Sequence, residues 1–220
     1  MARIRDSRIA SAAVARIIAR MSRQLGTLLV VSGPSGSGKT TLCRKLAELG
    51  EAHYSISCTT RAPREGEQDG RDYHFLTRES FTAKLAADEF LEHAEVHGNH
   101  YGSLKAEVLA CLEAGTDVVM DIDVQGAAQV RQCGDPLIRR AFADVFVMPH
   151  DEAELRARLS GRGTDSEETI ALRMANALEE IQQSPLYQYR LLSTTRDEDF
   201  RRFLSILTAE RMKTIRSATA

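Results

Sequence analysis

The sequence predicts an α/β fold in which a central parallel sheet is flanked by helices. Three short segments, 28–31, 118–122 and 145–148, are continuously or almost continuously apolar rather than alternating. Runs of this kind are typical of strands that are buried on both faces of a sheet. Between them lie segments with helical spacing of apolar residues, and strands that alternate with helices form parallel sheets.

The composition excludes several classes of protein. The chain has 220 residues, a formal net charge of −2, 43% hydrophobic and 27% charged residues. These values disfavour disorder and a simple coiled coil. The sequence contains no run of about 18 apolar residues, so we expect no membrane span. A charge this close to zero argues against a nucleic-acid partner. The four cysteines form no C-x-x-C pair, so we expect reduced thiols and a cytoplasmic protein. The sequence indicates no oligomeric state.

The first 26 residues differ from the rest in charge, because they hold six arginines and a single acidic residue, Asp6. Residues 9–21 show helical spacing, with an apolar stripe beside a basic one. We therefore expect residues 1–26 to be a basic N-terminal extension, either helical or flexible. Two interpretations are open: a membrane-surface or transit-type helix, or a segment without function, which would be a frayed extension or an upstream start ahead of a natural beginning at Met21.

The elements after Gly26 follow in order. The apolar run 28–31 is the first expected strand, and the helix after it ends at Gly50, a residue type that commonly follows helix ends. Pro63, Gly66 and Gly70 make 59–73 a loop. The strand 118–123 ends in acids, and Pro149 closes the strand 145–148. The expected helices are 40–49, 79–87, 103–114, 151–160, 166–183 and 198–212.

The strongest local motif lies between the first strand and its helix and matches G-x-x-x-x-G-K-[ST]. Glycines in such a loop let backbone N–H groups turn toward phosphate oxygens, and the following helix directs its positive end at the same anion. Lys39 would reach the β- and γ-phosphates and Thr40 would hold Mg²⁺. The expected ATP-binding residues are Gly33, Pro34, Ser35, Gly36, Ser37, Gly38, Lys39 and Thr40.

Asp121 and Asp123 end the second strand. The carboxyl ends of parallel strands meet at the edge of the sheet where ligands bind. An acid beside a phosphate loop can hold Mg²⁺ or its water shell. We expect Thr40 and Asp121 to bind Mg²⁺, with Asp121 acting directly or through water.

Several further motifs occur in a fixed order: SCTTRAPREGE at 57–67, GRDYHF at 70–75, FLEHA at 90–94, GNHYGS at 98–103 and DIDVQG at 121–126. Together with the phosphate loop, they resemble the guanylate kinase family, which transfers the γ-phosphoryl group of ATP to GMP. The resemblance runs from about Gly26 to about Arg211. It implies a P-loop kinase with a small mixed-β GMP-binding insert and a helical lid, using ATP with Mg²⁺ and accepting GMP and dGMP.

The resemblance also implies domain boundaries. The kinase-like domain would span 27–213, between the extension 1–26 and a C-terminal tail at 214–220. Its expected parts are a core of 27–54, 104–150 and 175–213, a GMP-binding region at 55–103 and a lid at 151–174.

The resemblance assigns the GMP phosphate to four side chains and the base to four others. Arginine forks and phenolic hydroxyls suit phosphate oxygens. A carboxylate matches the N1 and N2 donors of guanine, whereas adenine presents an acceptor at N1, so Glu92 would exclude AMP. The implied phosphate-binding residues are Arg61, Arg64, Tyr73 and Tyr101. The implied base-contacting residues are Ser57, Glu92, Ser103 and Asp123.

The segment 158–168 resembles the lid of the same family. Arg158, Arg162 and, farther on, Arg173 match arginines that close on the phosphates of ATP. In phosphoryl transfer, charge spreads over the equatorial oxygens, and a delivered arginine contributes about 10³–10⁵ in rate. With Lys39, these three arginines are the expected catalytic residues.

Some residues depart from the family pattern. His100 stands where a tyrosine is usual, and Ser193 and Thr194 stand where a strand usually ends in Asn-Asp. Arg190 is unusual for a buried strand. Two alternatives stay open at this point: a ribose 1,5-bisphosphate phosphokinase, and a non-catalytic guanylate-kinase-like module that binds peptides.

Overall fold

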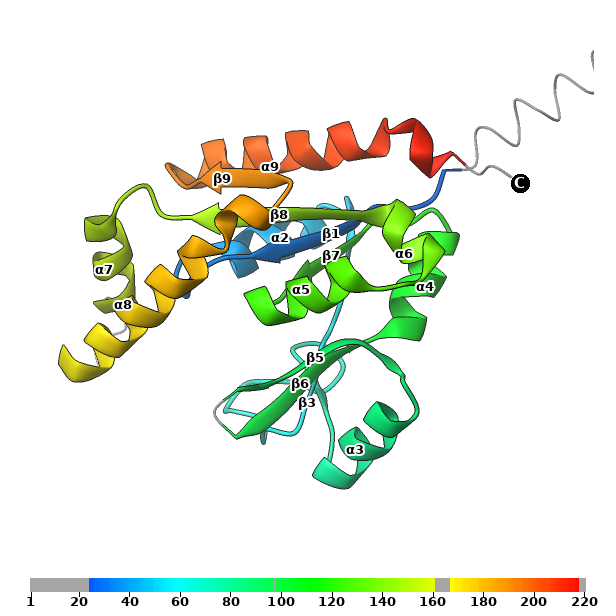
Figure 1. The fold of residues 1–220 in the computed structure, drawn as a ribbon, viewed down its shortest axis with the longest axis horizontal. Helices are drawn as coiled ribbons and strands as arrows, with labels where there is room; N and C mark the ends of the chain where they lie inside the picture. The colour runs from blue at the N-terminus through cyan, green and yellow to red at the C-terminus, as the bar shows by residue number, and fades with distance from the viewer. Residues whose placement is uncertain (1–23, 97, 161–166, 218–220) are drawn as a thin grey trace, which may run out of the picture.

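The computed structural model describes residues 24–96, 98–160 and 167–217. The expected N-terminal helix at 9–21 lies outside these residues. The described chain forms a large parallel sheet with helices on both faces, a smaller sheet, and an arm of two helices (Figure 1). Within the described part of the chain, no helix combines the length and apolar character needed to span a membrane.

The large sheet has five strands in the order β2-β7-β1-β8-β9, and every neighbouring pair is parallel. This order confirms the predicted fold class. Its strands are β2 (His53–Tyr54), β7 (Val118–Asp121), β1 (Leu28–Ser32), β8 (Phe142–Met148) and β9 (Tyr189–Leu192).

The continuous apolar runs are explained by cores on both faces of this sheet. Leu29 and Val31 of β1 pack toward α2 (Lys39–Glu48) and α9 (Arg196–Arg211). The alternate residues, Leu28 and Val30, belong to the core on the other face. That core is covered by α4 (Lys105–Glu113), α5 (Val124–Gln132) and α6 (Pro136–Ala141).

The smaller sheet is mixed and has the order β4-β3-β6-β5. Its strands are β4 (His74–Phe75), β3 (Cys58–Thr59), β6 (Asn99–Leu104) and β5 (Phe90–Val96). Helix α3 (Arg78–Ala86) begins after Thr77, whose side chain accepts from the Ser80 N–H. Phe81 of α3 stacks on Phe90 with ring centroids 4.4 Å apart, which anchors the helix to this sheet.

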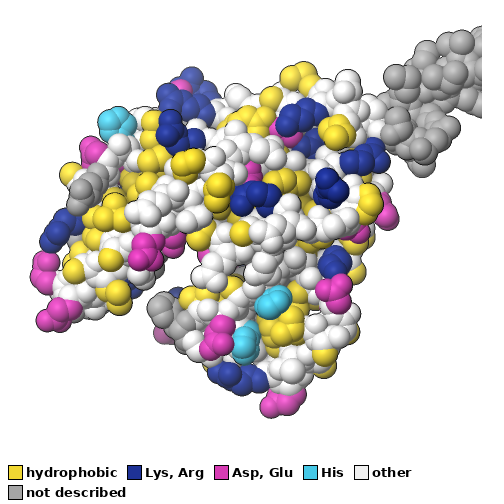
Figure 2. Space-filling view, in the orientation of Figure 1, with side chains coloured by type: hydrophobic (Ala, Val, Ile, Leu, Met, Phe, Trp, Pro, Cys, Tyr) yellow, Lys and Arg dark blue, Asp and Glu magenta, His cyan; other side chains and the backbone are white. Residues whose placement is uncertain are grey.

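The arm consists of α7 (Glu152–Ser160) and α8 (Glu167–Gln182). Leu155 and Leu159 of α7 pack against Ile170 and Met174 of α8, so the arm has its own small core. A short 3₁₀ turn, η1 (Ser184–Leu186), leads from α8 toward β9, and a second, η2 (Thr214–Arg216), follows α9. Figure 2 shows a notch between the arm and the lobe of the smaller sheet.

Three local differences from the sequence-based expectations have clear causes. The expected strand 118–123 ends at Asp121, because Asp123 caps the start of α5 by accepting from the Gly126 N–H. Arg190 is exposed, since β9 is the edge strand of the large sheet. The expected helix 198–212 begins two residues earlier, at Arg196, because Thr195 supplies the cap by accepting from the Glu198 N–H.

Candidate active site

The phosphate loop connects β1 to α2, as its motif predicted. Gly33, Gly36 and Gly38 all have positive φ. At Gly33, a Cβ atom would stand 2.0 Å from the carbonyl oxygen of Val147 on the adjacent strand, so any other residue would push the loop off the sheet. Gly38, at φ 95°, is the residue from which α2 starts. The loop therefore takes a path that only glycine fits at these positions.

The end of α2 that faces the loop has the character of an anion site. No acidic residue lies in the first turn of α2, and no side chain caps its N-terminus. The Lys39 ammonium donates to the carbonyl oxygens of Gly33 and Pro34, at 2.5 and 3.0 Å. A helix N-terminus and a lysine at the same loop attract phosphate strongly.

Thr40 and Asp121 meet beside this loop. The Thr40 hydroxyl donates to the Asp121 carboxylate over 2.5 Å, although the two residues are 81 positions apart in sequence. A hydroxyl and a carboxylate are oxygen ligands of the kind Mg²⁺ prefers, and Mg²⁺ in kinases takes one or two such ligands and substrate phosphates. The chemistry of these two groups fits the expected metal.

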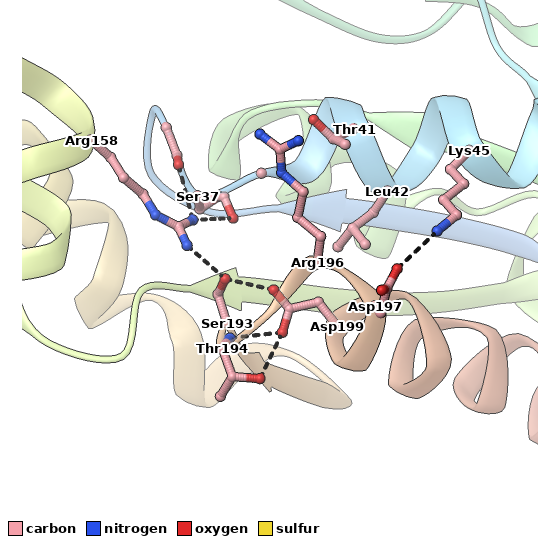
Figure 3. Close-up of a pocket in the computed structure, with 12 residues that line it drawn as sticks. Ser37, Thr41, Leu42, Lys45, Arg158, Ser193, Thr194, Arg196, Asp197 and Asp199 are labelled. Carbon is pink, nitrogen blue, oxygen red and sulfur yellow. Dashed lines mark hydrogen bonds and ion pairs between the residues drawn. The ribbon is translucent and has the colours of Figure 1, made fainter. Parts of the chain in front are cut away.

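Two cavities lie on either side of the phosphate loop. The first, of about 540 Å³, is lined by Gly36, Ser37 and Gly38 and by residues of α2, α7 and the β9–α9 turn (Figure 3). The second, of about 370 Å³, is lined by Gly33, Ser35, Lys39 and Thr40 and continues toward the smaller sheet. One loop is thus shared by two spaces, each within the size range of small-molecule sites.

The second cavity gathers many of the residues expected to bind Mg²⁺ and GMP. Besides the loop, its lining includes Ser57, Tyr73, Asp121 and Asp123. Glu92 and Ser103 are joined to it by hydrogen bonds. Ser103 donates to the Glu92 carboxylate at 2.7 Å, and its hydroxyl lies 3.3 Å from that of Ser57.

Glu92 is a buried carboxylate, with 5% of its surface exposed. Burial raises the pKa of Glu92, the charge of Asp123 adds to the rise, and the Ser103 hydrogen bond offsets part of it. Gly126 of α5 passes so close that a Cβ there would stand 2.7 Å from a Glu92 oxygen. A buried acid that is not neutralised by a cation is suited to a ligand that brings hydrogen-bond donors.

The expected phosphate-binding group is only partly assembled. Tyr73 contacts the Tyr101 ring edge-on at 6.0 Å, and the Arg61 guanidinium lies 5.4 Å from the centroid of the Tyr73 ring. Arg61 is bound to the Glu67 carboxylate by two hydrogen bonds of 2.8 and 3.0 Å, which hold the pKa of Glu67 below its ordinary value. The Arg64 side chain is exposed. None of Arg61, Arg64 and Tyr101 lines the second cavity in this conformation.

Comparison with known proteins gives the family. The sequence profile of guanylate kinase matches residues 25–210. The chain belongs to the guanylate kinase family. A relative named guanylate kinase from Cereibacter sphaeroides is 47% identical over 86% of this chain and 88% of its own. Another, from Caulobacter vibrioides, is 44% identical over 87% of this chain and 89% of its own.

A solved structure of guanylate kinase from Anaplasma phagocytophilum has a TM-score of 0.71 to this chain at 33% identity. The match covers 89% of this chain and 92% of that one. Because so large a share of both chains is matched, the family fold extends over most of this protein.

The three expected lid arginines are placed differently by the structure. Arg158 of α7 donates to the carbonyl oxygens of Gly36 and Ser37 at 3.3 and 3.2 Å, against the first cavity. Arg173 lies on α8 and is partly exposed. Arg162 lies outside the described residues. Among the expected lid arginines that the structure describes, Arg158 is the one with hydrogen bonds to the phosphate loop.

Some residues of the second cavity were not predicted from the sequence. Arg44, Tyr54, Ser55, Asp72 and Glu180 also line it. The Arg44 guanidinium is paired with Asp72 at 3.1 Å. The Ser55 hydroxyl is buried and has no hydrogen-bond partner among the described residues. Ser55 stands two positions before the predicted Ser57, and this spacing was the signal that the sequence offered for it.

Proposed function

We propose that this protein transfers the γ-phosphoryl group of ATP to GMP, and to dGMP, yielding ADP and the nucleoside diphosphate. The observation that carries the proposal is the pair of cavities that share one phosphate loop, with the buried Glu92 bonded to the rim of the second cavity. Membership of the guanylate kinase family supports the same reaction. We place the reaction in the cytoplasm, where both nucleotide substrates are found.

ATP would bind with its phosphates in the loop and its base toward the first cavity. Lys39 would exchange the carbonyl oxygens of Gly33 and Pro34 for the β- and γ-phosphates. Bound Mg²⁺ would supply charge neutralisation on the phosphate oxygens, with Thr40 and Asp121 as its protein-side ligands, directly or through water. The remaining loop residues would offer backbone N–H groups.

GMP would bind in the second cavity. Glu92 would accept from N1–H and N2–H of guanine, while Ser57, Ser103 and Asp123 contact the base. Arg61, Arg64, Tyr73 and Tyr101 would hold the phosphate, and Arg61 would give up one or both bonds to Glu67 to do so. Adenine would present a lone pair to the buried Glu92, which costs several kcal/mol.

The transfer itself needs positioning rather than a strong base. An oxygen of the GMP phosphate attacks the γ-phosphorus, and the bond to the bridging oxygen of ADP breaks. This oxygen is already ionised near neutral pH, so no proton has to be removed. Lys39 and the arginines at 158, 162 and 173 would stabilise the charge that spreads over the transferred group. Closure of the notch in Figure 2 would exclude water.

A coupled ADP-release assay tests the function. The purified chain is given ATP and Mg²⁺ with GMP, dGMP, AMP or ribose 1,5-bisphosphate as acceptor. We expect turnover with GMP and dGMP. Turnover with ribose 1,5-bisphosphate alone would assign the alternative kinase activity, and ATP binding without turnover on any acceptor would indicate a non-catalytic module.

Replacing the loop lysine tests the assignment of Lys39. We expect Lys39→Ala to lower kcat by about 10³-fold or more, because a charge aimed at the transferred phosphoryl group is lost. GMP binding, measured by calorimetry, should be retained, since the second cavity keeps its base-contacting residues. Lys84→Ala, which removes a half-buried lysine paired with Glu89 on the smaller-sheet lobe, is the control. A kcat for Lys39→Ala near the wild-type value would reject this role.

A further inference from the structure

The β9–α9 turn borders the first cavity at the point where the chain departs from the family pattern. Ser193 and Thr194 stand there in place of Asn-Asp. Figure 3 shows that a third residue, Asp199 of α9, points back toward both of them. Asp199 has 7% of its surface exposed and Ser193 has 1%. No role has been assigned to this buried acid so far.

Both oxygens of the Asp199 carboxylate accept hydrogen bonds from this turn. One oxygen accepts from the Thr194 N–H at 2.8 Å and from the Thr194 hydroxyl at 3.3 Å. The other accepts from the Ser193 hydroxyl at 2.7 Å. A buried carboxylate is tolerated when such donors compensate for lost water.

The hydrogen bonds run in one direction, from Arg158 to Asp199. Arg158 Nη2 lies 3.0 Å from the Ser193 hydroxyl oxygen. A guanidinium has donors and no acceptor, so Ser193 accepts from Arg158 and directs its own hydrogen toward Asp199. The negative charge of Asp199 therefore polarises the Ser193 oxygen toward the arginine.

Arg158 is held on three sides. Its Nη1 donates to the carbonyl oxygens of Gly36 and Ser37 in the phosphate loop, and its Nη2 donates to Glu154 at 2.5 Å and to Ser193. One guanidinium thus ties together the arm, the loop and the β9–α9 turn (Figure 3). The Ser193 backbone is itself fixed, because its N–H donates to the Met148 carbonyl oxygen of β8.

We propose that Asp199 and Ser193 are positioning residues that fix the Arg158 guanidinium against the phosphate loop, so that affinity for the phosphoryl donor depends on Asp199. This proposal rests on the proposed kinase function and deepens it at the donor side. Asp199 also lines the first cavity, but both of its carboxylate oxygens accept hydrogen bonds from Ser193 and Thr194. It would act through the Ser193 hydroxyl on the orientation of Arg158.

An amide side chain in place of the Asp199 carboxylate cannot reproduce this arrangement. If the amide oxygen faced Ser193, the NH₂ group would face the Thr194 N–H, and two donors would oppose each other. If the amide were turned over, its NH₂ group would donate to the Ser193 oxygen and compete with Arg158. Either orientation loses a hydrogen bond, while the size of the side chain is unchanged.

The test is a double-mutant cycle in the coupled assay. Asp199→Asn and Ser193→Ala are each made in the wild-type chain and in Arg158→Ala. Glu198→Gln is the matched control, since this neighbouring acid of α9 pairs with Arg201 and Arg202 and does not line the cavity. For every variant, KM for ATP, KM for GMP, kcat and the thermal midpoint are measured, and ATP binding is followed by calorimetry.

We expect Asp199→Asn and Ser193→Ala to raise KM for ATP about tenfold, the loss typical of a hydrogen bond to a charged group. KM for GMP should stay within about twofold, and the Asp199→Asn effect on ATP should disappear in Arg158→Ala because neighbouring groups act as one unit. An unchanged KM for ATP, or an equal loss with and without Arg158, would overturn the proposal. Ser193→Ala keeps the test decisive if Asp199→Asn unfolds.

The experiment distinguishes failure of this positioning role from failure of the proposed kinase function. If the wild-type chain does not phosphorylate GMP, the proposed function fails, and the calorimetric ATP affinities still report whether Asp199 acts through Arg158. If the wild-type chain is active and the variants bind ATP as it does, the function stands and the positioning role is rejected.

Discussion

At the scale of single residues, Glu92 sets the stability of the fold against its proposed role in binding guanine. Its carboxylate is 5% exposed and is bonded to a neutral hydroxyl, that of Ser103, rather than to an arginine or lysine. Arg61, in contrast, already has a carboxylate partner in Glu67. Glu92, the proposed guanine-binding acid, is thus bonded to a neutral group, whereas Arg61, a proposed phosphate-binding cation, is paired with an acid.

This conflict predicts a pH-dependent stability difference between wild type and Glu92→Gln. Because burial raises the pKa of Glu92, the folded state disfavours its ionised form. The wild type bears that cost above the folded-state pKa and is relieved of it once the pH falls below the ordinary value. At pH 7, we expect Glu92→Gln to unfold at a temperature at least as high as wild type.

Thermal unfolding from pH 7 to pH 4 checks this prediction. The advantage of Glu92→Gln over wild type should shrink as the pH falls. An advantage that grows toward pH 4, or a variant that is less stable at pH 7, would show that the carboxylate stabilises the fold.

The positions of candidate residues were predictable where they lie within one contiguous motif, and less so where folding brings distant residues together. Lys39 and Thr40 follow from the loop motif alone. The pairing of Thr40 with Asp121 needed two strand ends to meet, which the parallel-sheet prediction supplied. Asp199 gave no signal, because its contact with Ser193 depends on the turn before α9.

At the scale of elements, the start of the edge strand β9 is held to β8 by a buried acid of β8, Asp144. Asp144 of β8 has no exposed surface; it accepts from Arg131 of α5 at 3.0 and 2.5 Å and from the Gln188 N–H at 2.7 Å. The Arg131 guanidinium also lies 4.8 Å from the centroid of the Tyr187 ring. A single ion pair thus joins α5, β8 and the entry to β9.

Removing the arginine should therefore destabilise the sheet edge. We expect Arg131→Leu to lower the free energy of unfolding by about 3 kcal/mol, since an uncompensated buried carboxylate is left behind. Urea unfolding measures the loss. Arg202→Leu, which removes an exposed ion pair with Glu198, should cost less than about 1 kcal/mol. Equal losses in the two variants would contradict this role for Asp144.

Long elements were easier to predict than short ones. The strand β1 and the helices α2, α8 and α9 carry enough apolar spacing to be recognised. The two-residue strands β2, β3 and β4 have no period to detect, and the mixed sheet was expected through family likeness. Helices α5 and α6 were missed, because Gly126 weakens the helical signal of α5 and α6 has only six residues, too few to show a period.

At the scale of the whole molecule, the first and last described segments are joined by a hydrogen bond between Leu25 and the buried Arg216. Arg216 has 1% of its surface exposed and contacts the Glu210 carboxylate and the carbonyl oxygens of Arg140 and Ala141. Its own carbonyl oxygen accepts from the Leu25 N–H at 2.9 Å. Within residues 214–217, which belong to the expected C-terminal tail, Arg216 is buried, whereas Thr214 and Ile215 are exposed.

Loss of this arginine should weaken the whole domain. We expect Arg216→Ala to lower the free energy of unfolding by about 3 kcal/mol, because Glu210 stays buried without its buried partner. The thermal midpoint should fall by about 6–12 °C for a domain of this size. Lys213→Ala removes the exposed partner of the same Glu210 and should cost less than about 1 kcal/mol. If both variants lose the same stability, the buried Arg216–Glu210 pair does not stabilise the domain more than the exposed pair does.

In the proposed reaction, ATP bound at the phosphate loop gives its γ-phosphoryl group to a nucleotide whose base is bound by Glu92. The ratio of kcat/KM for GMP to that for AMP, measured in wild type and in Glu92→Gln, tests it most directly. We expect a ratio of about 10⁴ or more in wild type and a fall of about 10²-fold in Glu92→Gln, carried by kcat/KM for GMP. A wild-type ratio near one, or a ratio unchanged by the substitution, would show that Glu92 does not select guanine.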